Sequence, residues 1–258
     1  MLSIVDHIYC LSAENSKRRP IVQQRLIDAQ MTPFTFYPAI MDKSNPTKGC
    51  YLSHNAIWRH ALDNGYSRIL IFEDDVIFNR QLTTEDYQDI KYIIDTKQWM
   101  VFFLGHLPLT MKETSNKRVF LVHSLCTHAY IINCSYIPYL LSFNYKKLTP
   151  ILQGIDGLLM YQSNCYALYP MICIQDNTMI SQIDNIYKLC TLSIHQWLCI
   201  NMPMSAIFCH QIMFSTYIYY SGYPHLANLI LVLYFLLLLL ILILVILLII
   251  LVICRFIF

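Results

Sequence analysis

Three consecutive acids, Glu73, Asp74 and Asp75, follow a compact apolar run at residues 68–72. Such a run is typical of a strand that is buried on both faces, which places the acids at its carboxyl end. On extended backbone Glu73 and Asp75 point to one side and Asp74 to the other. Two carboxylates on one side suit a hard divalent cation such as Mg²⁺ or Mn²⁺, and ligands of open α/β sheets bind just beyond strand carboxyl ends. The alternative interpretation is a solvated acidic turn, because short acidic motifs are frequent.

A fourth acid, Asp156, lies in the apolar segment 152–158 between Gly154 and Gly157. An ionised carboxylate is costly in such surroundings unless it has a role, and the glycines allow a ligand to approach the backbone closely. Asp156 is therefore a candidate functional carboxylate, of a kind that can act as a general base. The alternative is a helix N-cap, a position that Asp favours.

Basic, sulfur and imidazole side chains offer further chemistry. Arg18 and Arg19 follow the first predicted strand, where they would contact a nucleotide or form a solvated basic turn. Cys50 and His54 have the i, i+4 spacing of a metal-binding pair, but no second pair has zinc-ligand spacing. A third ligand could come from other histidines, each more simply interpreted as structural: His106, His123 and His128. Ser53 and His54 do not make a nucleophilic pair, because adjacent residues on a helix point apart.

Strand and helix signals alternate along the part of the chain that carries these residues. Short apolar runs predict strands at residues 4–11, 34–40, 68–72, 100–104 and 129–132. Helical periodicity predicts helices at residues 19–30, 49–63 and 85–96. This alternation predicts an α/β domain with a largely parallel sheet.

Charge separates the chain into two parts. The 258 residues carry 18 Lys and Arg against 16 Asp and Glu, a formal net charge of +2. This balance argues against a nucleic-acid-binding protein driven by phosphate attraction, and a hydrophobic content of 56% excludes intrinsic disorder. All acids precede Asn185, and no charged side chain lies between Lys188 and Arg255. We therefore expect a globular domain at 1–188, an apolar juxtamembrane connector at 189–225 and a transmembrane helix at 226–254.

The segment 226–254 contains one strongly polar residue, Asn228. As a helix it would exceed the about 30 Å hydrocarbon core of a bilayer, so it predicts a single-pass, C-terminal membrane anchor. The first ten residues lack the apolar core of a signal peptide, so we expect the domain on the cytosolic side. The connector either lies at the membrane interface or packs on the domain.

Several blocks, in chain order, resemble glycosyltransferase family 25, which includes lipooligosaccharide and collagen galactosyltransferases. The most specific are Gly49-Cys50-Tyr51-Leu52-Ser53-His54, with Trp58 one turn on, and Glu73-Asp74-Asp75. Weaker matches are Ile8 to Leu11 with Lys17-Arg18-Arg19, Phe36 to Asp42, Thr127 to Ile132, Ile155-Asp156, and Gln175 with Ser181-Gln182-Ile183. The resemblance covers residues 1–185. One departure is Cys126, where the family often has a small residue.

The resemblance implies a GT-A fold, a UDP-sugar donor, commonly UDP-galactose, and a divalent metal. Carried over to this chain, it implies metal ligation by Glu73 and Asp75, catalysis by Asp156, and donor binding by Arg18, Arg19, Ser53, His54 and Asp74. We thus expect a manganese- or magnesium-dependent inverting enzyme of the lipopolysaccharide-biosynthesis type. It would move galactose or glucose to a hydroxyl of a glycan, a lipid-linked sugar or a protein.

Two other functions are compatible with the same residues. A non-catalytic, membrane-tethered protein would keep the fold without turnover. A metal-dependent phosphotransfer enzyme would use the acidic cluster differently and release phosphate instead of UDP.

Overall fold

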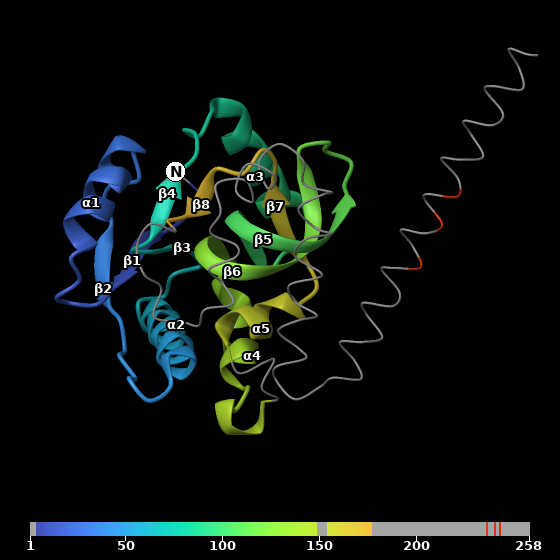
Figure 1. Cartoon of the computed structure of the whole chain (residues 1–258). Coiled ribbons are helices and arrows are strands. Elements are labelled where there is room, and N and C mark those ends of the chain that lie inside the picture. Colours follow the sequence, from blue (N-terminus) through green and yellow to red (C-terminus); the bar gives the residue numbers. More distant parts are fainter. Residues whose placement is uncertain (1–3, 149–153, 177–235, 237–239, 241–242, 244–258) are drawn as a thin grey trace, which may run out of the picture. The chain divides into compact units, whose positions relative to one another are not determined.

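The computed structural model describes residues 4–148 and 154–176, together with positions 236, 240 and 243 (Figure 1). The chain divides into two compact units, Met1–His210 and Gln211–Phe258. The predicted boundaries at residues 188 and 225 lie outside the described residues. The first unit contains both sheets and all of the candidate site residues.

A six-stranded mixed sheet forms the centre of this unit, in the order β2-β1-β3-β6-β5-β7. β1 is parallel to β2 and β3, whereas β6 is antiparallel to both of its neighbours, β3 and β5. The expectation of an α/β fold is confirmed, and the expectation of a largely parallel sheet is wrong. The strands are β1 (His7–Ser12), β2 (Thr35–Pro38), β3 (Arg68–Glu73), β5 (Val101–Glu113), β6 (Val119–Asn133) and β7 (Cys165–Leu168).

The long strands β5 and β6 explain why the sheet is mixed. The runs predicted at 100–104 and 129–132 are the buried ends of strands of 13 and 15 residues. Only the short link 114–118 joins the two strands, so β6 turns back and inserts antiparallel between β3 and β5. A direct antiparallel connection needs no crossover helix, so the alternation of strands and helices fails here as a predictor.

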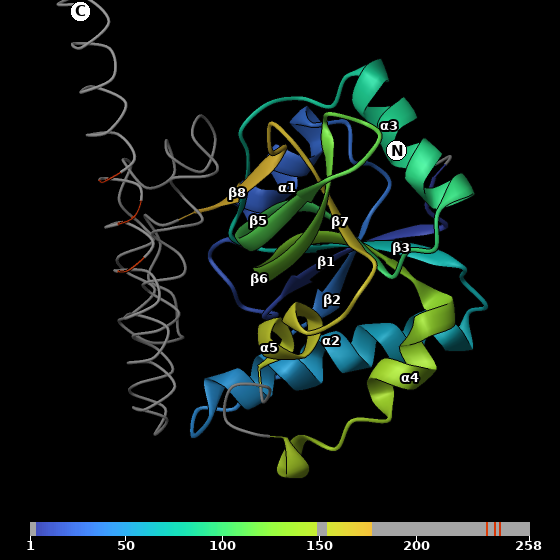
Figure 2. The same cartoon turned by 90° about the vertical axis from the view of Figure 1, so that its right-hand side faces the viewer.

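Helices cover both faces of the sheet, and Figure 2 shows this three-layer arrangement. On one face α1 (Arg19–Asp28) and α3 (Thr84–Thr96) bury Val22, Leu26, Ile90 and Ile93. The other face carries α2 (Pro46–Asp63), α4 (Ile137–Leu141) and α5 (Ile155–Met160). Short 3₁₀ helices are present at Cys134–Tyr136 and Tyr145–Lys147. Alternate side chains of the strands thus enter two separate hydrophobic cores, one on each face of the sheet.

Helix α2 has a well-defined start and a close contact with the preceding loop. The side chain of Asn45 caps the helix by accepting from the N–H of Lys48 at 3.0 Å, and Pro46 occupies its first turn. A Cβ on Gly49 would lie 2.7 Å from the carbonyl oxygen of Ile40. The glycine therefore allows α2 to approach this loop, and it fixes the depth at which Cys50 and His54 reach the sheet.

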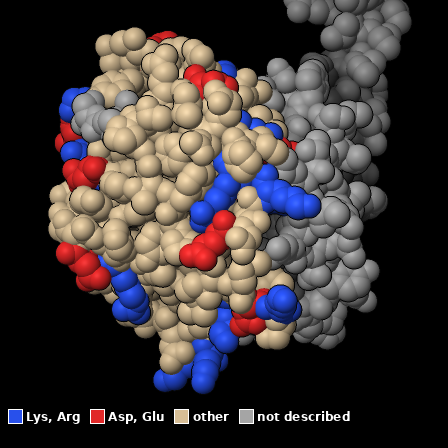
Figure 3. All heavy atoms as spheres, turned by 90° about the vertical axis from the view of Figure 1, so that its left-hand side faces the viewer, with Lys and Arg blue, Asp and Glu red and all other residues tan. Residues whose placement is uncertain are grey.

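A second, two-stranded sheet pairs β4 (Val76–Phe78) with β8 (Cys173–Gln175) in antiparallel fashion. It begins directly after the three acids and brings the end of the described domain next to them. On the face drawn in Figure 3, basic and acidic side chains are interspersed, as the near-neutral composition predicts.

The expected transmembrane helix at 226–254 lies outside the described residues except at Leu236, Leu240 and Ile243. These three positions are helical and about half exposed. In the part of the chain that the structure describes, no helix combines the length and apolarity needed to cross a bilayer.

Candidate active site

The three acids of the sequence motif stand where β3 ends and the turn to β4 begins. β3 lies between β1 and β6, so the motif is placed near the middle of the sheet. Asp75 is 6% exposed, and the Glu73 side chain is 22% exposed. The motif is therefore a largely buried acidic group and not a solvated acidic turn.

Asp74 is used to fix the loop after β1. One of its oxygens, Oδ2, accepts hydrogen bonds from the hydroxyls of Ser12 at 2.7 Å and Ser16 at 2.8 Å, and Oδ1 accepts from Arg18 at 3.2 Å. The same arginine nitrogen lies 3.7 Å from the carboxylate of Asp75. Asp74 thus positions Arg18 at the acidic group, and Arg18 is the predicted basic residue that the structure places there.

Glu73 and Asp156 are linked through one hydroxyl, that of Thr127. The Thr127 Oγ1 lies 2.7 Å from Glu73 Oε1 and 3.1 Å from Asp156 Oδ1. A hydroxyl carries one proton, so at any moment it donates fully to only one of the two carboxylates. The end of β3 and the first turn of α5 therefore meet at this hydroxyl. Asp156 lies in that turn, two residues after the N-cap Gly154. Asp156 is not itself the N-cap.

The two linked carboxylates titrate differently. Burial alone would raise the pKa of Glu73, but hydrogen bonds from His54 and Thr127 hold this pKa below its ordinary value. Burial and the nearby charge of Glu73 raise the pKa of Asp156 to about 6. Asp156 also accepts a hydrogen bond from the backbone N–H of Cys126, whose φ of 67° is unusual for a residue with a side chain. A carboxylate whose pKa lies near neutrality suits proton transfer.

Asp75 is the least compensated of these acids. Its Oδ2 accepts from the side-chain amide of Gln175 at 2.9 Å. Its Oδ1 is buried and has no hydrogen-bond partner among the described residues. Burial and the charge of Glu73 raise the pKa of Asp75 to about 7. An orphaned carboxylate oxygen next to a second carboxylate fits a divalent cation, which would supply the missing partner and offset the repulsion.

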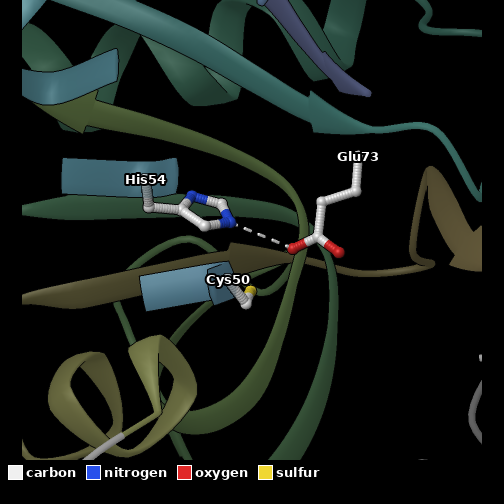
Figure 4. A group of neighbouring side chains, drawn as sticks. All are labelled: Cys50, His54 and Glu73. Atoms are coloured by element: carbon white, nitrogen blue, oxygen red, sulfur yellow. Dashed lines mark hydrogen bonds and ion pairs between the residues drawn. The ribbon is translucent and has the colours of Figure 1, made fainter. Parts of the chain in front are cut away.

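His54 and Cys50 also reach Glu73, from successive turns of α2 (Figure 4). One ligand atom from each of Cys50, His54 and Glu73 lies within 4.8 Å of the others. Burial and the charges of Glu73, Asp156 and Asp75 raise the pKa of the Cys50 thiol well above its ordinary value. A neutral thiol is a poor metal ligand, since metals bind the thiolate. The trio is thus a geometrical candidate in which a bound metal would have to displace the thiol proton.

Two predicted donor-binding residues serve internal packing instead. The hydroxyl of Ser53 donates to the carbonyl of Gly49 at 2.7 Å and accepts from the N–H of Ile40 at 2.8 Å. The guanidinium of Arg19 lies 4.9 Å from the ring centre of Phe36 and donates to the carbonyl of Ser12. Both side chains thus help to hold α2 and β1 in place, and ligand binding by Ser53 and Arg19 stays a prediction.

Three residues at the site carry roles that sequence reasoning did not assign. Thr127 links two carboxylates, Gln175 binds the side chain of Asp75, and Asp176 binds the backbone of Asp75. The Asp176 carboxylate forms an ion pair with Arg25 at 2.6 Å, and its N–H donates to the carbonyl of Asp75 at 2.6 Å. Thr127 and Gln175 stand in recognisable blocks of the sequence, but only the antiparallel insertion of β6 and the β4–β8 pair bring them to the acids. No sequence signal marked Asp176.

Comparisons with known proteins bear on this site. The model of "Glycosyltransferase family 25 (LPS biosynthesis protein)" matches residues 44–152, which include α2, the acidic motif and Thr127. A relative from Haemophilus influenzae, named "Putative glycosyltransferase", is 26% identical over 203 residues. The match covers 66% of this chain and 70% of the relative.

A mammalian relative and a solved structure share shorter or weaker likeness. "Inactive glycosyltransferase 25 family member 3" of Mus musculus is 32% identical over 68 residues, which is 25% of this chain and 11% of that protein. The chain therefore spans about a tenth of the length of this mammalian relative. The crystal structure of a glycosyltransferase involved in the glycosylation of the major capsid of PBCV-1 superposes with a TM-score of 0.42 and 10% identity, covering 68% of this chain and 95% of that one.

Proposed function

Because residues 44–152 match the model of glycosyltransferase family 25, we propose that the protein is a metal-dependent, inverting glycosyltransferase with a GT-A domain. It transfers a hexose, galactose or glucose, from a UDP-sugar to a hydroxyl of a glycan, a lipid-linked sugar or a protein. The sequence resemblance supports the UDP-sugar and the inverting outcome.

One observation carries the proposal: the buried Asp75 lies with the partly buried Glu73 and Asp156, and the charges of Asp75 and Asp156 are not offset by matching cations. The pKa values of Asp75 and Asp156 are raised, and Asp75 Oδ1 lacks a partner among the described residues. Such an arrangement costs stability unless a ligand completes it. A group of strained carboxylates at a strand end is typical of a functional site, because binding and catalysis use the charges that folding leaves uncompensated.

Glu73 and Asp75 are the residues that would hold the metal. A bound Mn²⁺ or Mg²⁺ would supply positive charge to the diphosphate leaving group. Arg18, held by Asp74, adds a guanidinium at the same place and would contact the nucleotide. His54 is fully buried and contacts Glu73, so it acts on the donor through this carboxylate.

Asp156 is the proposed base of the transfer step. The acceptor oxygen attacks the anomeric carbon from the face opposite UDP, the bond between that carbon and the UDP oxygen breaks with its electron pair leaving on UDP, and the hydroxyl proton passes to Asp156. The Thr127 hydroxyl, which donates to either Glu73 or Asp156, keeps the base oriented. A base with a pKa of about 6 is ionised at neutral pH and still accepts a proton readily.

A second candidate function is a non-catalytic protein that keeps this fold. The name of the murine relative, an inactive family member, favours considering it. Such a protein would bind a UDP-sugar, or nothing, at the same acids without turnover.

We also propose that residues 226–254 anchor the chain in a membrane, with the domain on the cytosolic side. The apolar composition of this segment, in which Asn228 is the one strongly polar residue, supports the anchor. An anchor would keep the domain beside a membrane-bound acceptor.

The test is release of UDP from UDP-galactose and UDP-glucose by the purified full chain, with and without Mn²⁺. We expect metal-stimulated release that Asp75→Asn abolishes. Asp95→Asn is the matched control, because Asp95 is an exposed acid paired with Lys91 on α3. UDP-sugar binding without release would favour the non-catalytic protein. Release of inorganic phosphate in place of UDP would indicate a phosphotransfer enzyme.

A further inference from the structure

A line of buried hydrogen-bonding side chains leads from the interior of the domain to Glu73. The indole Nε1 of Trp58 lies 3.2 Å from the hydroxyl of Tyr130, and this hydroxyl lies 2.8 Å from Nδ1 of His54. The opposite ring nitrogen, Nε2 of His54, lies 3.2 Å from Oε1 of Glu73. Trp58, Tyr130 and His54 are all fully buried, on α2 and β6.

The donors in this line have a fixed direction. An indole nitrogen only donates, so the Tyr130 oxygen accepts from Trp58. Burial raises the pKa of Tyr130 well above its ordinary value, so its hydroxyl keeps the proton. In this fully buried position the hydroxyl proton is directed to Nδ1 of His54. An Nδ1 that accepts carries no proton, so the proton of the neutral ring lies on Nε2 and faces Glu73.

The other forms of His54 are disfavoured by the same contacts. The Nδ1–H tautomer would turn a lone pair of Nε2 toward the carboxylate of Glu73. The Nδ1–H group would also compete with Trp58 for the Tyr130 oxygen and would leave a buried hydroxyl without an acceptor, which costs about 1–3 kcal/mol.

We propose that Trp58, Tyr130 and His54 are positioning residues that hold His54 as its Nε2–H tautomer and thereby orient the Glu73 carboxylate for the proposed metal and donor. The proposal rests on the proposed function for its catalytic consequence. His54 and Thr127 both bind Oε1 of Glu73, and among the described residues these are the hydrogen bonds to this carboxylate. Oε2 is therefore the oxygen directed to the cation.

The same tautomer argues against a resident zinc at Cys50, His54 and Glu73. A metal at Nε2 would displace its proton, so the proton of the ring would lie on Nδ1. The N–H groups of Trp58 and of His54 Nδ1 would then both point at the Tyr130 oxygen, and the Tyr130 hydroxyl proton would lack its acceptor. The trio in Figure 4 is better explained as the end of these hydrogen-bonded positioning residues beside a half-buried thiol.

The direct test is ¹⁵N NMR of the histidine-labelled full chain, with the His54 signals assigned by their loss in His54→Gln. We expect a proton-bearing signal at Nε2 and a pyridine-type signal at Nδ1. A protonated Nδ1, in either the neutral or the doubly protonated ring, would overturn the proposal. Tyr130→Phe removes only the hydroxyl, and it should shift His54 toward a mixture of tautomers.

A matched pair of variants tests the effect on turnover. The amide nitrogen of His54→Gln takes the place of Nε2 and still donates to Glu73, whereas that of His54→Asn takes the place of Nδ1. We expect His54→Asn to lower kcat for UDP release about tenfold or more, and His54→Gln to restore most of it, because a hydrogen bond to a charged group is lost in one and kept in the other. Equal losses in both folded variants would contradict the proposal. A wild-type chain that releases no UDP would contradict the proposed function, and the NMR result would still decide the tautomer.

Discussion

At the start of α3 the fully buried Asp86 is held by two arginines, whereas around the end of β3 the acids Glu73, Asp75 and Asp156 are offset mainly by neutral donors and one arginine. Arg80 and Arg118 both bind the Asp86 carboxylate, and Thr83 completes a capping box with it. Burial would raise the pKa of Asp86, but the hydrogen bonds from Arg80 and Thr83 hold it below its ordinary value. At the second site the pKa values of Asp75 and Asp156 are raised.

The contrast separates a structural acid from acids available for chemistry. A buried carboxylate that only stabilises the fold is matched by cations and caps. Asp75 and Asp156 lack such a match, although the same chain builds one for Asp86. The unmatched charge at the second site is therefore a property of that site and not a general tolerance of buried acids.

The largest expected effect is on turnover. Asp156→Asn removes the proposed base with little change in shape, so kcat for sugar transfer should fall by about 10²–10⁴-fold while UDP-sugar binding is retained. UDP release and donor binding by the full chain measure the two quantities. Near-normal turnover by a folded Asp156→Asn variant would remove Asp156 from the mechanism.

The second-largest expected effect is a loss of stability when the Asp86 site is changed. Asp86→Asn leaves two arginines without their buried carboxylate, so the free energy of unfolding should drop by about 3–5 kcal/mol. Urea denaturation of the wild type, Asp86→Asn and Asp75→Asn makes the comparison, and Asp75→Asn should be neutral or stabilising without metal. If Asp75→Asn destabilised the protein as much as Asp86→Asn, the distinction between the two sites would fail.

Metal binding should stabilise only through the β3 site. At a free Mn²⁺ concentration about 100-fold above Kd, the wild type should gain about 2.7 kcal/mol in free energy of unfolding. Asp75→Asn should lose this gain, and the exposed control Asp95→Asn should keep it. Thermal unfolding with and without Mn²⁺ measures it, and an equal gain in Asp75→Asn would place the metal elsewhere.

The smallest effect is the dependence of stability on pH, which should have opposite signs at the two sites. The pKa values of Asp75 and Asp156 are raised in the folded state, so their contribution is present at low pH and is lost as pH rises through about 6 to 7. The pKa of Asp86 is lowered, so its contribution is present above its ordinary pKa and is lost as pH falls through the lowered value.

Denaturation curves of the metal-free protein check this dependence. Stability should decline toward pH 7 in the wild type and less so in Asp75→Asn. A wild type that gains stability over this interval would show that the acids at β3 are already compensated.

Particular residues show how much of the fold and of the site could be predicted from the sequence. The apolar run 68–72 predicted β3, and the helical stripes predicted α1, α2 and α3 to within a few residues. The acidic motif, Arg18 and Asp156 were recognised from residue type and local context, and the structure brings them together. Ser53 and Arg19 bind neighbouring backbone carbonyls, a contact that local sequence does not predict for a polar side chain on a helix or loop.

By itself, the sequence determined the local elements and the acids that they carry, since short-range periodicity and residue chemistry act over a few positions. Only the tertiary structure decided which groups surround those acids. The antiparallel insertion of β6 supplies Thr127 and Tyr130, the β4–β8 pair supplies Gln175 and Asp176, and α2 supplies His54. These partners are far apart along the chain, and the pKa of a buried carboxylate depends on such partners and on burial, which no local pattern encodes.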